Sequence, residues 1–417
     1  MEENSFAFFT GLSLELILMI FRQLDWPDIA SLAVVNQWFN NVIESHILYH
    51  PEEFGYALAY GVQVNNVATI RKVLRFGGSL VQDLGEASAI CPQTATPFLA
   101  ADEEDDFKRI RRSWTYDEIS NTALGLATFQ GNADMIRELL ELGADPYHYA
   151  SVDRLGPWHY VLKKAPPQTA PRLAAEFLRS NRIDTNKILP DGLLPLHLAV
   201  DSRLNSVFEM LVDTYFADIN LTAGAASETA LLRAVSKRHT LLIDFLLREP
   251  GIKVNCTDHN GQSALILAVI QGNSRVVERL LSKGVDANHK DKWGQSALTW
   301  AVILNIQEVL EPLLDDSRVD LNTQNTSGMT PLSIASWYGD YYMATQLLQY
   351  QDIDVHLQNE NGETALSIAK SWRVVLKGGA NWSEPPKPGF VARDDIGRNS
   401  YKESYDEIVA IINKYVG

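Results

Sequence analysis

Few residues of this 417-residue chain have the types and spacing that catalysis requires. The sequence contains no Gly-rich phosphate loop, no Gly-x-Ser-x-Gly turn and no His-Glu-x-x-His helix. Cys91, in Ala-Ile-Cys-Pro-Gln, is the one side chain that could be imagined as a thioester-forming nucleophile. No histidine stands near it in the sequence to act as its base. We therefore expect no catalytic residue and no enzymatic activity.

The two cysteines limit metal and redox chemistry. Cys91 and Cys256 lie far apart in the sequence, and two thiols cannot form a disulfide framework or a cysteine-based zinc site. We expect no metal, no cofactor and a reducing compartment, the cytoplasm or the nucleus. The first residues, Met1-Glu2-Glu3, lack the basic start of a signal peptide, and no apolar stretch approaches 18 residues. We expect no membrane insertion.

The formal net charge of −16 argues against nucleic acid and anionic membranes as main partners, because both carry negative charge themselves. A protein partner of basic or mixed charge fits better, unless a local basic patch overrides the bulk field. With 46% hydrophobic and 21% charged residues, the composition is that of a folded protein rather than a disordered one.

One phrase recurs along the chain: glycine, two residues, a small residue, leucine, two residues, alanine. It reads Gly261-Gln-Ser-Ala-Leu265-Ile-Leu-Ala268 in one copy and Gly328-Met-Thr-Pro-Leu332-Ser-Ile-Ala335 in another. Such regular spacing indicates a repeat protein, in which each unit buries its apolar face only against its neighbours. The leucines stand at positions 196, 231, 265, 298, 332 and 366, separated by 35, 34, 33, 34 and 34 residues.

Each unit is predicted to contain a turn, a first helix, a second helix and a loop. The alanine lets adjacent helices approach closely, and the glycine permits the backbone of the turn. Amphipathic stretches such as residues 275–281 follow each phrase and are closed by a glycine, here Gly284. The phrase resembles the Thr-Pro-Leu-His-x-Ala signature of the ankyrin repeat. The resemblance implies that His197 hydrogen-bonds a turn and that Trp300, next to Ala301, belongs to the core.

Weaker units precede the regular run, at residues 68–77, 122–145 and 157–161. We count eight or nine repeats over residues 54–417. Two segments interrupt them, residues 85–118 with opposed acidic and basic runs, and residues 374–402 with Pro385-Pro-Lys-Pro388. We interpret both as surface insertions, although a docking peptide at the prolines is an alternative. Residues 405–415 are predicted to form the last second helix.

The N-terminal fifty residues do not follow the repeat. Leucine or isoleucine at 12, 16, 20 and 24 forms one stripe of a helix, and Asp25-Trp-Pro27-Asp28 ends that helix and starts another. This segment resembles the F-box, although Ser13 stands where the F-box has proline. The matching residues are Leu12, Glu15, Leu16, Ile20, Leu24, Asp25, Ile29, Leu32, Val35, Asn36 and Phe39.

The two resemblances together imply an all-α chain, with a three-helix F-box at residues 1–50 and an ankyrin α-solenoid at 51–417. An F-box implies a Skp-type adaptor and, through it, a cullin-RING ubiquitin ligase. The chain would be the substrate-recruiting subunit, and it would act by proximity. The alternatives are a scaffold or inhibitor without ligase function, and an F-box in a non-cullin complex. The implied adaptor-binding residues are Leu12, Leu16, Ile20, Ile29, Leu32 and Val35.

The substrate is expected on positions that ankyrin repeats usually leave exposed, just past the alanine of each phrase. Large apolar and aromatic residues stand there, and such residues are favoured as anchors at protein interfaces. The alternative is that this stripe packs locally or against residues 374–402. The identity of the bound protein does not follow from the sequence. The expected substrate-binding residues are Trp293, Ile303, Leu304, Trp337, Tyr338 and Trp372.

Overall fold

The computed structural model describes residues 54–63, 65–75, 77–80, 122–148, 155–377 and 400–416. All regular elements in these ranges are helices, and β-type pairing is limited to isolated bridges such as Thr257 with Ser263. The all-α prediction is confirmed. The F-box stripe, Cys91 and the insertion at 85–118 lie outside the described residues, as do residues 378–399 of the second insertion.

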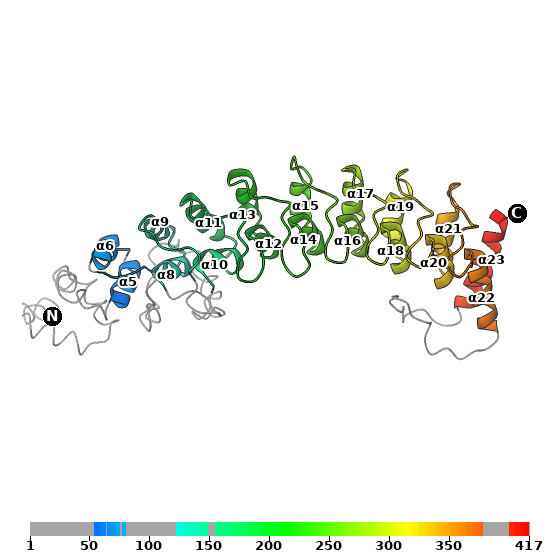
Figure 1. The fold of residues 1–417 in the computed structure, drawn as a ribbon, viewed down its shortest axis with the longest axis horizontal. Coiled ribbons are helices and arrows are strands. Elements are labelled where there is room, and N and C mark those ends of the chain that lie inside the picture. The colour runs from blue at the N-terminus through cyan, green and yellow to red at the C-terminus, as the bar shows by residue number, and fades with distance from the viewer. Residues whose placement is uncertain are drawn as a thin grey trace, which may run out of the picture. The chain divides into compact units, whose positions relative to one another are not determined.

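First and second helices alternate along the described chain, nine of each (Figure 1). The first helices are α5 (Phe54–Gln63), α8 (Ala123–Phe129), α10 (Pro157–Lys163), α12 (Pro195–Asp201), α14 (Ala230–Ser236), α16 (Ala264–Ile270), α18 (Ala297–Leu304), α20 (Pro331–Tyr338) and α22 (Ala365–Lys377). The second helices are α6 (Val67–Arg75), α9 (Ala133–Glu141), α11 (Ala170–Arg179), α13 (Asn205–Glu209), α15 (Thr240–Leu246), α17 (Ser274–Ser282), α19 (Leu310–Leu314), α21 (Tyr341–Leu348) and α23 (Ser400–Val416).

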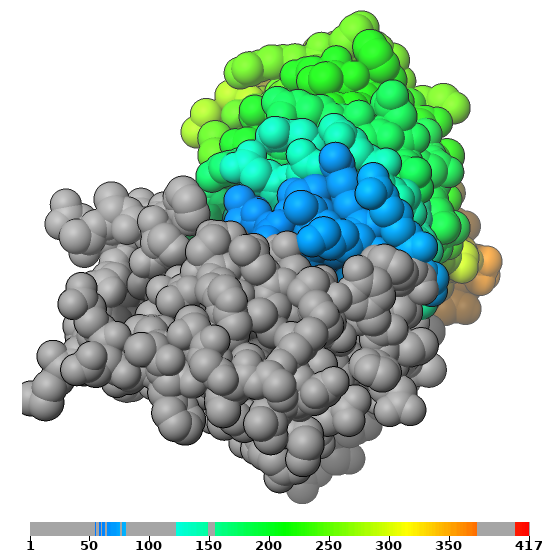
Figure 2. All heavy atoms as spheres, turned by 90° about the vertical axis from the view of Figure 1, so that its left-hand side faces the viewer, coloured from blue at the N-terminus to red at the C-terminus, as the bar shows by residue number. Residues whose placement is uncertain are grey.

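The chain divides into two compact units. Unit 1 runs to Leu189 and includes Asp201–Phe216, so it holds α5 to α11 and α13. In unit 1 the α5–α6 pair, blue in Figure 2, lies beside α8 and α9, in cyan, and α5 contacts α8. Unit 2 comprises Pro190–Val200 and Ala217–Gly417, with α12 and α14 to α23. In unit 2 each first helix from α14 to α22 contacts the first helix that follows it.

The phrase alanines form the contact between successive first helices. Ala268 and Ala335 are 0% exposed, and the equivalent alanines of the other copies are equally buried. A methyl side chain lets neighbouring helix backbones approach closely, and a larger side chain there would overpack the contact. The predicted register is therefore confirmed. The fully buried alanines at this position of the repeat are Ala127, Ala199, Ala234, Ala268, Ala301, Ala335 and Ala369.

A hydroxyl at the residue before the first helix begins that helix. Thr229, Ser263 and Thr330 each accept a hydrogen bond from the backbone N–H three residues later, which satisfies one of the donors left open at a helix start. Second helices use an amide or a carboxylate instead, as Asn273 and Asp340 show. Short helices of seven to nine residues are marginal alone, so these caps and the packing together fix their ends.

The loops after the second helices are joined by a ladder of amide side chains. In unit 2, Asn288 Nδ2 donates to the Arg318 carbonyl at 2.7 Å, and its Oδ1 accepts from Asp320 N at 2.7 Å. Asn322 repeats this pattern with Asp352 and Asp354. Each amide thus satisfies one donor and one acceptor of the following loop, and the polar backbone of one repeat depends on the next.

In unit 1 a tyrosine takes the place of the asparagine. Tyr147 Oη donates to the Asp184 carbonyl at 3.3 Å and accepts from Asp184 N at 2.8 Å. Burial raises the pKa of the Tyr147 hydroxyl, so it stays protonated at neutral pH and keeps its donor. The Lys187 ammonium lies 3.9 Å from the ring centroid, a cation–π contact.

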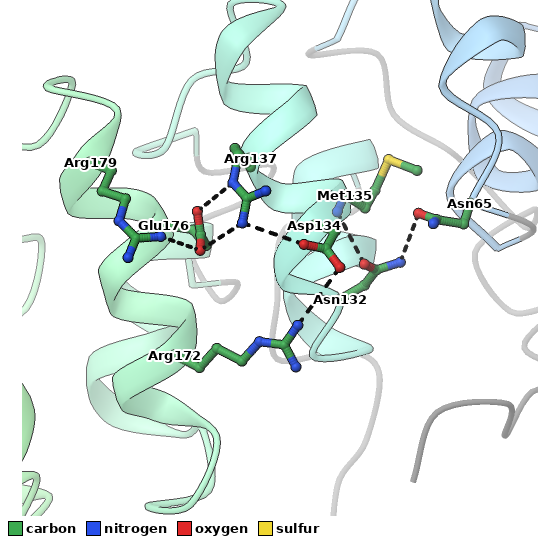
Figure 3. A network of polar contacts seen from close by, with 8 residues as sticks. All are labelled: Asn65, Asn132, Asp134, Met135, Arg137, Arg172, Glu176 and Arg179. Carbon is green, nitrogen blue, oxygen red and sulfur yellow. Dashed lines mark hydrogen bonds and ion pairs between the residues drawn. The ribbon is translucent and has the colours of Figure 1, made fainter.

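A buried carboxylate joins α9 and α11 (Figure 3). The Glu176 side chain is 5% exposed, and both its oxygens accept from Arg137, at 2.9 and 3.0 Å. Arg179 donates to the same carboxylate at 2.8 Å. Asp134 extends the network, 3.4 Å from Arg137 and 3.7 Å from Arg172. The Arg137 hydrogen bonds hold the pKa of Glu176 below its ordinary value, against burial, which acts to raise it.

Replacing the carboxylate, Glu176→Gln, should lower the free energy of unfolding by about 1 to 2 kcal/mol at neutral pH, because the hydrogen bonds lose their charge. A carboxylate whose pKa falls on folding stabilises the fold above its unfolded pKa, about 4.3. This stabilisation is lost as the pH falls through the folded pKa. The difference between wild type and variant, measured by urea unfolding, should therefore shrink towards zero below that pH.

The control is Glu141→Gln, which removes an exposed carboxylate from the same helix as Arg137. We expect this substitution to change the free energy of unfolding by no more than about 0.5 kcal/mol, both at neutral pH and below the folded pKa of Glu176. Equal effects of the two substitutions would show that the ion pair contributes nothing beyond surface charge.

Candidate protein-binding surface

The turn before each first helix in unit 2 is a short hairpin that we call a finger. In the finger 291–295, Asp291 Oδ1 accepts the backbone N–H groups of Trp293 and Gln295, both at 2.9 Å. Asp258, Asn325 and Asn359 do the same in the other fingers. A side-chain acceptor two and four residues before its donors closes the turn locally.

Successive fingers are also tied to one another by backbone hydrogen bonds. Lys292 N donates to the Asn260 carbonyl at 3.0 Å, and Glu360 N donates to the Ser327 carbonyl at 3.2 Å. The glycine of the finger turn adopts a positive φ, +72° at Gly294 and +74° at Gly362. A Cβ on Gly294 would lie 2.6 Å from Thr326 N of the next finger, whereas a Cβ on Gly362 would meet no atom within 4 Å.

Each finger leads directly into a first helix, and the candidate residues lie at the fingers and toward the C-terminal ends of these helices. We call the fingers and these helix ends of unit 2 together the finger-and-helix face. Four of the six expected substrate-binding residues, Leu304, Trp337, Tyr338 and Trp372, are partly exposed there. Trp293, in its finger, is 46% exposed. Ile303 is 5% exposed on α18, which is packed between α16 and α20, so the expectation that it faces a partner is wrong.

Two tryptophans join a finger to a helix. The rings of Trp293 and Trp300 lie edge to face, with centroids 6.4 Å apart and planes at 88°. Trp300 Nε1 donates to Asp291 Oδ2 at 2.7 Å, so the indole is held against the base of the finger. Trp300 is partly exposed, which corrects the expectation that it belongs to the core. The Asp291 carboxylate orients its side chain, a contact that the spacing of the sequence does not reveal.

A second aromatic pair joins α20 and α22. Trp337 and Trp372 also meet edge to face, with centroids 5.2 Å apart. The Trp337 carbonyl accepts a hydrogen bond of 2.6 Å from the Tyr405 hydroxyl of α23. A Cβ on Gly339 would lie 2.8 Å from the Tyr405 ring, so only glycine leaves room for it. The stripe thus packs locally at this end, and α23 confirms the predicted helix at 405–415.

His197 fulfils the structural role that the ankyrin signature implies. Its side chain is buried, and Nε2 lies 2.8 Å from the Glu228 carbonyl in the following finger. Among the described residues, no three His, Cys, Asp or Glu side chains are grouped to hold a metal ion. The helices of the described ranges are too short or too polar to cross a membrane.

Comparisons with known proteins assign the repeat. A model of the ankyrin repeat matches residues 120–151, and a model of three ankyrin copies matches 231–325 and 265–359. The repeats at residues 120–151 and 231–359 are thus matched as ankyrin repeats. Over 93 residues, 22% of this chain, the sequence is 28% identical to Rabankyrin-5 of Mus musculus, and the match spans 8% of that protein's length.

A similar solved structure is the ankyrin repeat domain of Bcl-3, a member of the IkappaB protein family. The alignment covers 60% of this chain and 95% of that one, with 26% identity and a TM-score of 0.45. The ankyrin repeats predicted from spacing are confirmed by the family models at residues 120–151 and 231–359, and protein binding is the function that ankyrin repeats indicate.

The contacts between fingers yield one test. Gly362→Ala should cost about 1 kcal/mol, because alanine is strained at this positive φ. Gly294→Ala has the same strain and also forces the next finger to move, so we expect it to cost at least about 1 kcal/mol more. Urea unfolding of the full chain measures both. Equal losses would mean that the fingers do not constrain one another.

The contact between α23 and α20 yields another test. Tyr405→Phe should lower the free energy of unfolding by about 1 kcal/mol, because the Trp337 carbonyl loses its donor while the ring still covers Gly339. The control is Tyr415→Phe, which removes a hydroxyl from a side chain of α23 that is 51% exposed. Thermal unfolding and tryptophan fluorescence should be altered only by the first substitution.

Proposed function

We propose that the finger-and-helix face of unit 2 binds a second protein. The observation that carries this proposal is the row of partly exposed aromatic and apolar side chains on α16, α18, α20 and α22, with Trp293 at a finger. Side chains held in place by the fold lose little conformational entropy on binding, and tryptophan and tyrosine are favoured at binding hot spots. The binding residues in this proposal are Trp293, Leu304, Trp337, Tyr338 and Trp372.

We further propose that residues 1–50 attach the bound protein to a ubiquitin ligase. The F-box-like stripe would bind a Skp-type adaptor and, through it, a cullin-RING complex, so that the ankyrin repeats bring a substrate close to the charged ubiquitin. The family comparison finds no F-box in the chain. The support for this step is therefore the sequence pattern of residues 12–39 alone.

A scaffold or inhibitor without ligase function is the second candidate. The ankyrin repeats favour it equally, because they indicate protein binding and carry no information on ubiquitin. Adaptor binding separates the two functions, and co-purification of a cullin then separates a ligase subunit from an F-box protein of another complex.

The decisive experiment replaces two leucines of the stripe, Leu12→Ala with Leu16→Ala. In the full chain this variant should lose the adaptor in co-purification, since each buried leucine at an interface contributes about 2 kcal/mol. The control is Trp293→Ala, which should keep the adaptor because it changes only the finger-and-helix face. If wild-type amounts of adaptor remain bound to the leucine variant, the F-box assignment of residues 1–50 fails. If the wild type itself binds no adaptor, the chain is a scaffold or inhibitor and the ligase proposal fails.

A further inference from the structure

On the finger-and-helix face, the exposed charges between α14 and the finger 291–295 are positive, although the chain as a whole carries −16. Lys237 and Arg238 follow the end of α14. Lys292 lies within the finger 291–295, and Lys290 precedes it, with its Nζ donating to the Gln324 carbonyl at 2.7 Å. All four side chains are exposed. Acidic residues of unit 2 stand mainly on its second helices and the loops after them, for example Glu278, Glu308, Glu311, Asp315 and Asp320.

The carboxylates near these cations are already engaged. Glu228 is 3.0 Å from Arg233, and both side chains are largely buried. Asp258 and Asp291 each accept hydrogen bonds from backbone N–H groups of their own finger, so their carboxylates are held within the turn. The exposed Glu360 and the partly exposed Glu363 belong to the last finger of the row. The face therefore offers positive charge from α14 to the finger 291–295.

Arg238 stands in a conformation that disfavours its own side chain. Its φ is +55°, in the position where later repeats end the first helix with Gly272, Asn305 or Gly339. A left-handed conformation costs an ordinary residue about 1 kcal/mol relative to glycine. Arg238 Nη2 donates to the Gln271 carbonyl at 2.8 Å, so its charge is fixed between α14 and α16.

An apolar strip lies beside the cations. Leu267 and Ile270 of α16 and Trp300 and Leu304 of α18 are all partly exposed, and α16 contacts α14 on one side and α18 on the other. The Trp293 ring stands over Trp300 from the finger that contains Lys292 and follows Lys290. A ligand on this strip meets apolar side chains in its middle and ammonium or guanidinium groups at its edge.

We propose that this face binds an acidic segment of a partner protein that also carries apolar or aromatic side chains. The proposal rests on the protein-binding function proposed above and specifies the partner's chemistry. Carboxylates of the segment pair with Lys237, Arg238, Lys290 and Lys292, while its apolar side chains cover the strip of α16 and α18. The local charge thus points to a partner opposite in sign to the one that the net charge suggests. Four cations on a chain of charge −16 do not suit a nucleic acid.

The test selects binders to the full chain from a random-peptide phage library and measures the affinity of synthetic copies. We expect the enriched peptides to be acidic and rich in Phe, Trp, Leu or Ile, with affinity that falls as salt is added. The variant Lys237→Glu, Lys290→Glu, Lys292→Glu should weaken them at least about tenfold. Trp293→Ala should also weaken them about tenfold.

The matched control reverses three cations on the second helices and loops of unit 2, Arg248→Glu, Lys253→Glu and Lys283→Glu, all exposed. Both triple variants change the net charge equally, so only a local effect separates them. The control should change affinity by no more than about twofold.

Three other results would overturn the proposal. If the enriched peptides are basic and Trp293→Ala abolishes their binding, the partner is basic rather than acidic, although the face still binds a protein. Displacement of the peptides by a single-stranded oligonucleotide, from the wild type and not from the face variant, would assign the cations to nucleic acid. Peptides indifferent to every variant, or no enrichment at all, would overturn the proposed binding face as well.

Discussion

The polar backbone at both turns of each repeat in unit 2 is satisfied by the next repeat. The fingers donate N–H groups to the preceding finger, and the asparagine ladder joins the loops after the second helices. A single repeat would leave these groups open and its apolar helix faces exposed, so neighbours must fold together. This dependence fixes the register between repeats, because a shift by one residue would separate each donor from its acceptor.

Close packing at the alanines and hydrogen bonding at the turns involve only part of each first helix. The last turns of α16, α18 and α20, and Trp372 within α22, include side chains that are only partly covered. These positions can vary in chemistry without loss of the fold, which is why they suit recognition. In this chain they hold tryptophan, tyrosine, leucine and isoleucine, placed by a rigid framework. The pair of Trp337 and Trp372 is further fixed by Tyr405, so the last helix of the chain also shapes this surface.

Net charge and local charge point to different partners. The sum of −16 excludes nothing about a particular face, since charges screened by salt act over only about 10 Å. In unit 2 the finger turns draw Asp258 and Asp291 into their own backbone hydrogen bonds, whereas Lys290 and Lys292 remain exposed. The turn chemistry that closes the fingers is thus also what leaves their surface positive.

The sequence by itself determined the repeat and its register, whereas α22 and α23 extend by a few residues into the segment 374–402 that the sequence indicated as an insertion. The phrase that contains Leu265 and Ala268 predicted both burial and helix contact, because each repeat meets the same neighbours at the same spacing. The hydrogen bond of His197 to a turn was predicted from the same repeat signature. Tertiary structure alone decided which members of the apolar stripe are covered, since Ile303 and Trp337 occupy equivalent positions and differ in exposure. It also brought together Arg137 with Glu176 and Trp337 with Tyr405. Those pairs depend on rotamers and on the packing of one individual neighbour, and periodic spacing carries no information about either.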